Sequence, residues 1–172
     1  TICHKHNLDF KKMRNIMQDG YERNLNLAKA GFTSGPCLLK DTMQLNSFCN
    51  NFFELGSAAM KINENLPDLI IDKIKKKKNY NKKIIGLLGL AFKGETDDIR
   101  DSLSIKLLKK LKKLKFKVLQ SDEYYKNNQN VNKNELIKKS DIIIIGAPHK
   151  AYKKLKISKN KYLIDVWDFI GN

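Results

Sequence analysis

The sequence predicts an α/β protein in which a helical region is followed by a Rossmann-like, doubly wound parallel sheet. Two observations predict this fold. In the first part of the chain, apolar residues recur at intervals of three and four, which is the spacing of one helix face. In the second part, short apolar runs alternate with helix-like segments, and "DIIIIGAP" (141–148) is an uninterrupted apolar run. Such runs are typical of parallel strands that are covered on both faces.

A polar, lysine-rich stretch separates these two textures. "KKKKNYNKK" (75–83) contains no apolar residue apart from one tyrosine. We therefore place a helical central domain at 1–78 and a Rossmann-like domain at 82–172. The chain opens with Thr1, inside what looks like a helical pattern, so we expect it to be a fragment of a longer protein.

The helical region is predicted to contain three stretches of helix and one loop. Residues 1–27 have helical apolar spacing, and 28–36 form a loop rich in glycine. Helix resumes over 38–53 with an apolar, buried set formed by Leu38, Leu39, Met43, Leu45 and Phe48. A long helix runs from Leu55 to Ile74, and Pro67 either kinks it or starts a new segment.

The second region is predicted to alternate strands and helices. Its first strand lies in "KIIGLLGLAF" (83–92), and Asp101 and Ser102 are good openers for the amphipathic helix that follows. The later elements are, in order, a strand in 116–122, a helix in 132–140, a strand in 141–148 and a strand in 161–169. This order is that of a doubly wound sheet.

The charge and the cysteines exclude some classes of function. The formal net charge is +16, but only three of the basic residues are arginine, the usual reader of bases and phosphates. We therefore expect lysine-covered surface and no nucleic acid, with an anionic partner as the alternative. No stretch approaches 18 apolar residues, and no signal peptide is visible, so we expect no membrane span. Three cysteines without metal-type spacing indicate a reducing, cytoplasmic compartment and no metal site.

The first candidate for chemistry is the cysteine in "SGPCLLKDT" (34–42). A thiol at a helix start feels the positive end of the helix dipole, which lowers its pKa and favours the nucleophilic thiolate. Lys40 would act in the same direction. Asp41 lies one turn beyond Cys37 and could position a water molecule or accept a proton. The alternative, which spacing leaves open, is a packed core cysteine beside an ordinary surface Lys–Asp pair.

The second candidate is "GLLGLAFKGETDDIRDS" (86–102). Its first glycines resemble half of a dinucleotide-binding turn, and Lys93 and Arg100 could both reach a diphosphate. In the alternative interpretation, the neighbouring aspartates simply pair with these two cations. Asp122 follows the second strand, where such folds place a ribose-binding acid. His149 follows the third strand, near the sheet edge at which ligands bind, and is a weaker candidate for a ligand contact.

Together these segments resemble the UDP-glucose/GDP-mannose dehydrogenase family. "GFTSGPCLLKDT" looks like the family's glycine-rich loop with its nucleophilic cysteine, and "GLLGLAFKGETDDIRDS" looks like its more specific "GLAFKxxTDDxRxS" segment. "SDIIIIGAPHKAY" and "YLIDVWDFIG" resemble the last strands of its C-terminal domain. The resemblance covers essentially the whole chain, in the family's order. It implies the family's central helical domain and nucleotide-sugar domain, with the NAD-binding domain lying upstream.

The resemblance also implies a reaction and roles for individual residues. The family uses NAD to oxidise a sugar C6 alcohol to a carboxylate in two hydride steps, in routes such as polysaccharide biosynthesis. Cys37 would form a thiohemiacetal and then a thioester, and Asp41 would assist its hydrolysis. The substrate-binding residues would be Phe32, Gly35 and Lys93, and the cofactor-binding residues would be Lys40 and Arg100. A homodimer would form through the helix Leu55–Ile74.

Some residues depart from the family pattern. The loop reads G-P-C-L-L-K-D where many UDP-glucose enzymes have G-G-S-C-F-P-K-D, and "DVWDF" lacks the arginine that often holds the diphosphate. Arg23 is an imperfect match to an arginine that reaches across the dimer. The sugar therefore stays open among UDP-glucose, a UDP-N-acetylhexosamine and GDP-mannose. Two other classes also stay open: a non-catalytic nucleotide-binding module and a basic nucleic-acid binder.

Overall fold

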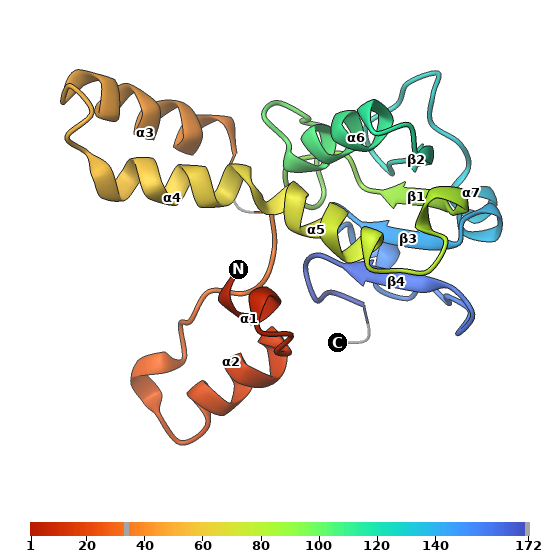
Figure 1. Ribbon diagram of the computed structural model, residues 1–172, viewed down its shortest axis with the longest axis horizontal. Coiled ribbons are helices and arrows are strands. Elements are labelled where there is room, and N and C mark those ends of the chain that lie inside the picture. Colours follow the sequence, from red (N-terminus) through yellow and green to blue (C-terminus); the bar gives the residue numbers. More distant parts are fainter. Residues whose placement is uncertain (33–34, 171–172) are drawn as a thin grey trace.

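A computed structural model describes residues 1–32 and 35–170 of the chain, so Thr33 and Ser34 of the predicted loop lie outside the described residues. Figure 1 shows a sheet domain from which two groups of helices extend. The elements of the first half are α1 (Ile2–Lys5), α2 (Phe10–Gln18), η1 (Glu22–Asn24), α3 (Pro36–Phe48), α4 (Glu54–Glu64), α5 (Leu66–Lys75) and η2 (Tyr80–Lys82).

The long helix predicted for 55–74 is in fact two helices. α4 ends at Glu64, and α5 begins at Leu66 with Pro67 in its first turn. Proline is tolerated there because the backbone N–H groups of the first turn have no partner within the helix. The prediction of one continuous helix is wrong, and the alternative in which Pro67 starts a new segment is confirmed.

The second half forms a four-stranded sheet in which all strands are parallel. The strands are β1 (Ile84–Leu88), β2 (Lys117–Ser121), β3 (Ile142–Ile145) and β4 (Tyr162–Asp165), in the order β2-β1-β3-β4. Ile85 of β1 pairs with Val118 of β2 on one side and Ile142 of β3 on the other. The connections contain α6 (Leu103–Lys113), α7 (Lys133–Lys139) and η3 (Lys150–Tyr152). The predicted Rossmann-like α/β fold is confirmed.

Helices cover both faces of this sheet. One face packs against α5 and α6, and its core includes Ile74, Leu107 and Ile144, all fully buried. The other face packs against α7 and η3 through Leu136 and Tyr152. Because the buried side chains of α5 belong to the core of the sheet, this helix packs as part of the second domain. The division between 1–78 and 82–172 remains a prediction.

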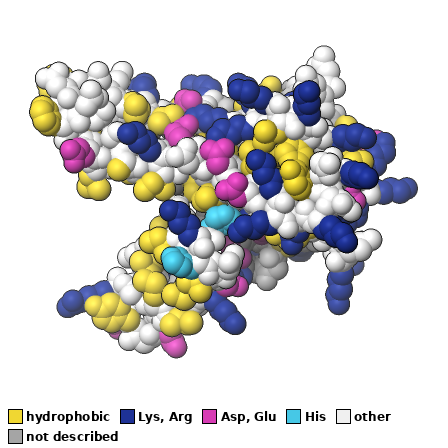
Figure 2. Space-filling model, viewed as in Figure 1, with side chains coloured by type: hydrophobic (Ala, Val, Ile, Leu, Met, Phe, Trp, Pro, Cys, Tyr) yellow, Lys and Arg dark blue, Asp and Glu magenta, His cyan; other side chains and the backbone are white. Residues whose placement is uncertain are grey.

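The helices that precede α5 bury very little. Within α3 and α4, which form a hairpin, the only buried residues are Asn46, Gly56 and Asn63. The helix predicted to be buried at its start is instead largely exposed: Leu39 is half-buried, but Leu38, Met43 and Leu45 are about half exposed, and Phe48 is 86% exposed. That prediction is wrong because the hairpin projects from the molecule and meets no other layer (Figure 2). We call this hairpin, residues 36–64, the helical arm.

Candidate functional site

Cys37 lies in the first turn of α3. The helix begins at Pro36, whose fixed φ suits the first helical position, and Gly35 precedes it in extended conformation. Free backbone N–H groups therefore surround the thiol, which is exposed to solvent. The interpretation of Cys37 as a packed core residue is wrong. The other half of that interpretation holds, because Lys40 and Asp41 form a surface ion pair at 3.2 Å.

The loop before Cys37 contacts the second candidate segment. A Cβ atom placed on Gly35 would lie only 2.9 Å from the Phe92 ring, so the Gly35 backbone packs directly on that side chain. Phe92 precedes Lys93 in the chain. Cys37 also lies close enough to Arg100 to contribute to the raised pKa of its guanidinium, although Asp98 has the larger effect. Two segments about 60 residues apart in the sequence therefore meet at one place.

The two cations of the second segment differ in their partners. Arg100 makes a forked contact with Asp98, with Nε 3.0 Å from Oδ1 and Nη2 2.7 Å from Oδ2. These hydrogen bonds, together with one from the Arg100 backbone N–H, lower the pKa of Asp98 to about 2. Lys93 is exposed, and its Nζ lies 5.4 Å from the Phe92 ring centroid. The alternative interpretation, in which neighbouring aspartates pair with the two cations, thus holds for Arg100. Lys93 forms no ion pair with a described residue.

Phe32 and Gly31 fix the loop from the other side. The Phe32 side chain is buried in the sheet core, so only its backbone is available to a ligand. A Cβ on Gly31 would lie 2.5 Å from the Trp167 ring, which leaves room only for glycine. The loop before α3 is therefore anchored to the residues that follow β4.

The glycines after 85 do not form a dinucleotide-binding turn. A Cβ on Gly86 would meet Leu136 and Ser140 at 2.3 and 2.4 Å, so this glycine lets α7 approach β1. Gly89 has φ +88, and a Cβ there would lie 2.5 Å from the backbone nitrogen of Ala147. Both positions are filled by protein, and the interpretation of this turn as a phosphate cradle is wrong.

Asp122 is also not free to bind a ribose. Its Oδ2 accepts the backbone N–H of Leu90 at 2.5 Å, and its Oδ1 accepts those of Tyr124 and Tyr125 at 2.8 and 2.9 Å. Burial by itself would raise the pKa of Asp122, but the hydrogen bonds from the His149 ring and from these backbone groups lower it to about 2. The carboxylate joins the ends of strands, so its predicted ligand role is wrong.

His149 lies beside Asp122, and its side chain is fully buried. Its Nε2 is 3.2 Å from Asp122 Oδ2, and its Nδ1 accepts the backbone N–H of Glu95 at 3.0 Å. The buried side chain of His149 is therefore not available for the ligand contact that was the weaker of its interpretations. The sequence interpretation missed the contact with Glu95, because the two residues are 54 positions apart and no spacing rule relates them.

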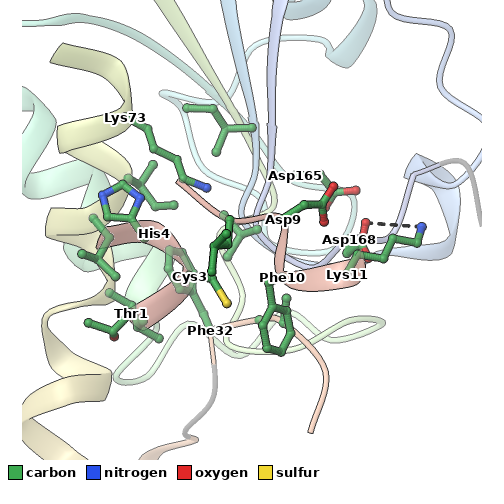
Figure 3. Close-up of a pocket in the computed structure, with 18 of the residues that line it drawn as sticks. Thr1, Cys3, His4, Asp9, Phe10, Lys11, Phe32, Lys73, Asp165 and Asp168 are labelled. Atoms are coloured by element: carbon green, nitrogen blue, oxygen red, sulfur yellow. Dashed lines mark ion pairs between the residues drawn. The ribbon is translucent and has the colours of Figure 1, made fainter. Parts of the chain in front are cut away.

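A cavity of about 770 Å³ lies elsewhere, between α1, α2, α5 and the end of β4. Figure 3 shows its lining, with His4 and Lys73 on one side and the Lys11–Asp168 ion pair, at 3.5 Å, on the other. The cavity reaches Gly31 and Phe32, but Cys37, Lys93 and Arg100 do not line it. We place the candidate site at Cys37 because its exposed thiol follows the loop that contacts the segment of Lys93 and Arg100, and Asp41 lies one turn further along α3.

The described residues offer neither a metal site nor a membrane-spanning helix. Residues 1–32 and 35–170 contain no group of three or more His, Cys, Asp and Glu side chains that could hold a metal ion. Within the same ranges, none of the helices combines the length and the apolar character that crossing a bilayer requires.

The comparison with known families decides the class of this fold and site. Residues 86–172 match the UDP-glucose/GDP-mannose dehydrogenase family, UDP binding domain. The chain belongs to this family. Proteins with similar sequences also carry the names of nucleotide-sugar dehydrogenases. UDP-N-acetyl-D-mannosamine dehydrogenase of Pyrococcus horikoshii is 30% identical over 142 residues, which cover 76% of this chain and 34% of that protein.

Further relatives agree with this assignment. UDP-glucose 6-dehydrogenase YwqF of Bacillus subtilis is 33% identical over 116 residues, which cover 64% of this chain and 26% of that protein. The structure of the Pyrococcus enzyme superposes with a TM-score of 0.81 and 25% identity, over 99% of this chain and 43% of that one. A GDP-mannose dehydrogenase of Pseudomonas aeruginosa shares the fold, with a TM-score of 0.74 and 22% identity over 96% and 44% of the two chains. The chain thus spans about a third of the length of its curated relatives.

Proposed function

We propose that this chain is the cysteine-bearing and substrate-binding part of an NAD-dependent nucleotide-sugar 6-dehydrogenase. The observation that carries the proposal is the contact between the Cys37 loop and the segment of Lys93 and Arg100, made where Gly35 packs on Phe92. The exposed thiol belongs to one of the two contacting segments and both cations belong to the other, which suits a substrate with a reactive sugar end and an anionic diphosphate. Membership of the family supports the same class of substrate.

The thiol accounts for the retention of the aldehyde between two oxidations. After the first hydride leaves the C6 alcohol, the Cys37 sulfur would add to the aldehyde carbon, and the carbonyl oxygen would take up a proton. Loss of a second hydride from the carbon, together with release of the hydroxyl proton to water, converts this thiohemiacetal into a thioester. Water then attacks the thioester carbon, Asp41 accepts the proton of that water, and the carboxylate leaves as the thiol is restored. Both hydrides would be taken up by NAD, the hydride acceptor of the reaction.

The diphosphate and the sugar would lie along the residues that flank Cys37. Lys93 is the cation without an ion-pair partner among the described residues, so it can bind a phosphate without first breaking a bond. Gly35 offers backbone N–H at the start of α3, and Phe32 can offer only its backbone. The named relatives act on different sugars, and the proposal covers the class of substrate without choosing among them.

The fit of NAD to this chain is only partial. The turn after β1 is filled by packing contacts, and Asp122 has no oxygen available to a ribose. Arg100 and Lys40 are exposed and could contact cofactor phosphates, although each is already paired with an aspartate. We therefore assign these two cations as cofactor contacts and assign the remaining NAD-binding residues to other parts of the parent protein.

We further propose that the parent protein is a cytoplasmic homodimer that serves polysaccharide biosynthesis and binds no nucleic acid. The predicted dimer helix Leu55–Ile74 now divides into two parts with different roles. In α4, Leu55 and Ile62 are exposed, whereas Ile70 and Ile74 of α5 are buried in the sheet core. The dimer contact would therefore be made by α4 and the rest of the helical arm.

Protection of the thiol by substrate tests the proposed function. In the variant C3S/C49S, Cys37 is the only thiol, and its alkylation by iodoacetamide at pH 7 can be followed by mass spectrometry. We expect UDP-glucose, UDP-N-acetylmannosamine or GDP-mannose to slow the alkylation of Cys37 at least about tenfold at saturation. The matched variant C37S/C49S leaves Cys3, which should show no such protection.

The alternatives give different outcomes in the same assay. A non-catalytic nucleotide-binding module would bind the nucleotide sugars in calorimetry, yet the alkylation rate of Cys37 would not change. A nucleic-acid binder would show neither effect and would bind duplex DNA with a steep dependence on salt. In the dehydrogenase interpretation, K93A should abolish the protection while its alkylation rate without ligand stays that of the parent variant.

A further inference from the structure

The segment between β1 and α6, residues 89–102, is fastened to the sheet by two buried side chains. These are Asp122, which follows β2, and His149, which follows β3, and both side chains are fully inaccessible to solvent. The segment carries Lys93 and Arg100, which the proposed function assigns to phosphate contacts. The proposed function gives neither Asp122 nor His149 a role. The reason for their buried contact with this segment must therefore be sought separately.

The hydrogen bonds define the state of the histidine ring. His149 Nδ1 accepts the backbone N–H of Glu95 at 3.0 Å, so this nitrogen carries no proton. The proton of the neutral ring is then on Nε2, from which it is donated to Asp122 Oδ2 at 3.2 Å. Asp122 Oδ2 also accepts the N–H of Leu90 at 2.5 Å. One buried pair thus holds the start of the segment through Asp122 and its middle through His149.

Glu95 is a residue that needs such an anchor. Its backbone is left-handed, with φ 57, a conformation that is unfavourable for a residue other than glycine. Its carboxylate oxygens accept the backbone N–H of Lys150 at 2.7 Å and the hydroxyl of Tyr124 at 3.0 Å. The neighbouring Gly94 packs so closely on the Pro148 carbonyl that a Cβ would lie 2.6 Å from its oxygen. These contacts join Glu95 and Gly94 to the residues that follow β2 and β3, and among them His149 contributes a fully buried side chain.

We infer that His149 is a positioning residue of the nucleotide-sugar site: by accepting the N–H of Glu95 it fixes the turn between Lys93 and Arg100. The inference rests on the proposed function, and it assigns His149 no contact with the substrate. Without this hydrogen bond the turn would sample other conformations. Binding of the phosphate would then have to order the turn, and the affinity would fall. The geometry of the cations would be lost while the fold remained.

Two amide variants separate the two hydrogen bonds of His149. The side-chain oxygen of asparagine lies near the position of Nδ1, so His149→Asn keeps an acceptor for the Glu95 N–H and loses the donor to Asp122. The longer glutamine brings its NH₂ group near the position of Nε2, so His149→Gln keeps the donor to Asp122 and loses the acceptor for Glu95. Both replace a buried ring by a smaller amide, so their general loss of packing is matched.

The affinity for UDP, measured by calorimetry on the 172-residue chain, is the first readout. Loss of one hydrogen bond corresponds to up to about a tenfold change in an equilibrium constant. We expect H149Q to bind UDP about tenfold more weakly than the wild type and H149N to stay within about threefold. Hydrogen exchange of the Glu95 amide is the second readout, and it should be faster in H149Q than in H149N. Thermal unfolding of the two variants should be similar.

A surface variant keeps the test valid even if the buried variants fold poorly. Tyr124→Phe removes only the hydroxyl that Glu95 accepts, and the side chain of Tyr124 is partly exposed. We expect it to weaken UDP binding about twofold to threefold and to speed exchange at Glu95. Equal UDP affinity in wild type, H149Q and Y124F would overturn the inference alone, as would a weakening in which H149N equals H149Q. If the wild type does not bind UDP, the proposed function fails, and the inference fails with it.

Discussion

The sheet domain and the helical arm differ sharply in what their apolar residues contact. In the sheet domain, the strand residues Ile85, Leu87 and Ile144 have no exposed surface. In the arm, Phe48, Phe52 and Leu55 are each more than 80% exposed. An apolar surface of this kind is typical of a surface that another protein segment covers. The apolar residues of the sheet domain are therefore buried within that domain, whereas those of the arm are left exposed to solvent by the fold of the chain.

Ion pairs, in contrast, connect α6 of the sheet domain to the base of the arm, by which we mean the end of α4 and the start of the following helix α5. Lys106 Nζ lies 2.6 Å from Glu64 at the end of α4, and Lys110 Nζ lies 2.7 Å from Asp68 in α5. Both lysines belong to α6, which covers the sheet. The arm is thus oriented at its base by charges on a helix of the core, while its tip projects away from the described part of the sheet domain (Figure 1).

The largest effect is expected from truncation in the sheet core. Leu107 of α6 is fully buried against the sheet, and Leu107→Ala should lower the free energy of unfolding by about 3 kcal/mol. The cost combines the lost burial and the cavity left by the side chain. Urea unfolding followed by far-UV circular dichroism measures it. A loss below about 1 kcal/mol would mean that the sheet domain is not the self-sufficient unit described above.

The second prediction concerns acid stability, and it comes from Asp122. Its pKa is lowered from 3.8 to about 2 in the folded protein, so its contribution of about 2 kcal/mol is present above pH 3.8. As the pH falls toward 2, the unfolded state binds the proton first and this contribution is lost. In Asp122→Asn, the free energy of unfolding should therefore change less between pH 4 and pH 2 than in the wild type. Parallel acid titrations of the two proteins would contradict this assignment.

Much of the sheet domain could be predicted from sequence, because its elements follow local rules. The run of four isoleucines at 142–145 became β3, and Ser102 became the N-cap of α6, where its side chain accepts the N–H of Ser104. The first strand was predicted to lie within the apolar run 83–92, without a defined end. It ends at Leu88 because Gly89 turns the chain with a positive φ to meet Ala147.

The parts that could not be predicted depend on residues distant in sequence. Asp122 and His149 were each treated as candidates for a ligand, since both follow strands, yet they bind each other and the backbone. The exposure of Phe48 was missed for a different reason. The 3.6-residue period of an apolar helix face shows that the face can be buried, but it does not show what covers it.

A smaller effect is expected at the base of the arm. The Lys106–Glu64 pair is about 70% buried on each side, and the Lys110–Asp68 pair is only about half buried. A double-mutant cycle with K106M and E64Q should give a coupling of about 1 kcal/mol, and the corresponding cycle at Lys110 about 0.5 kcal/mol or less. Added salt should weaken the second coupling more. Urea unfolding of each set measures both values, and equal couplings would show that burial does not distinguish the pairs.

The smallest effect on the monomer is expected in the arm itself. Because the Phe48 side chain is 86% exposed, Phe48→Ser removes almost no buried surface and should change the free energy of unfolding of a dilute sample by less than about 0.5 kcal/mol. If the arm is the dimer contact, the same substitution should shift the protein toward monomer in sedimentation velocity at high concentration. Lys154→Ser, an exposed residue of the sheet domain outside the arm, is the control and should leave the association unchanged. A dimer that persists in F48S would move the interface away from the arm, and the exposed apolar residues there would then belong to a contact with another part of the parent protein.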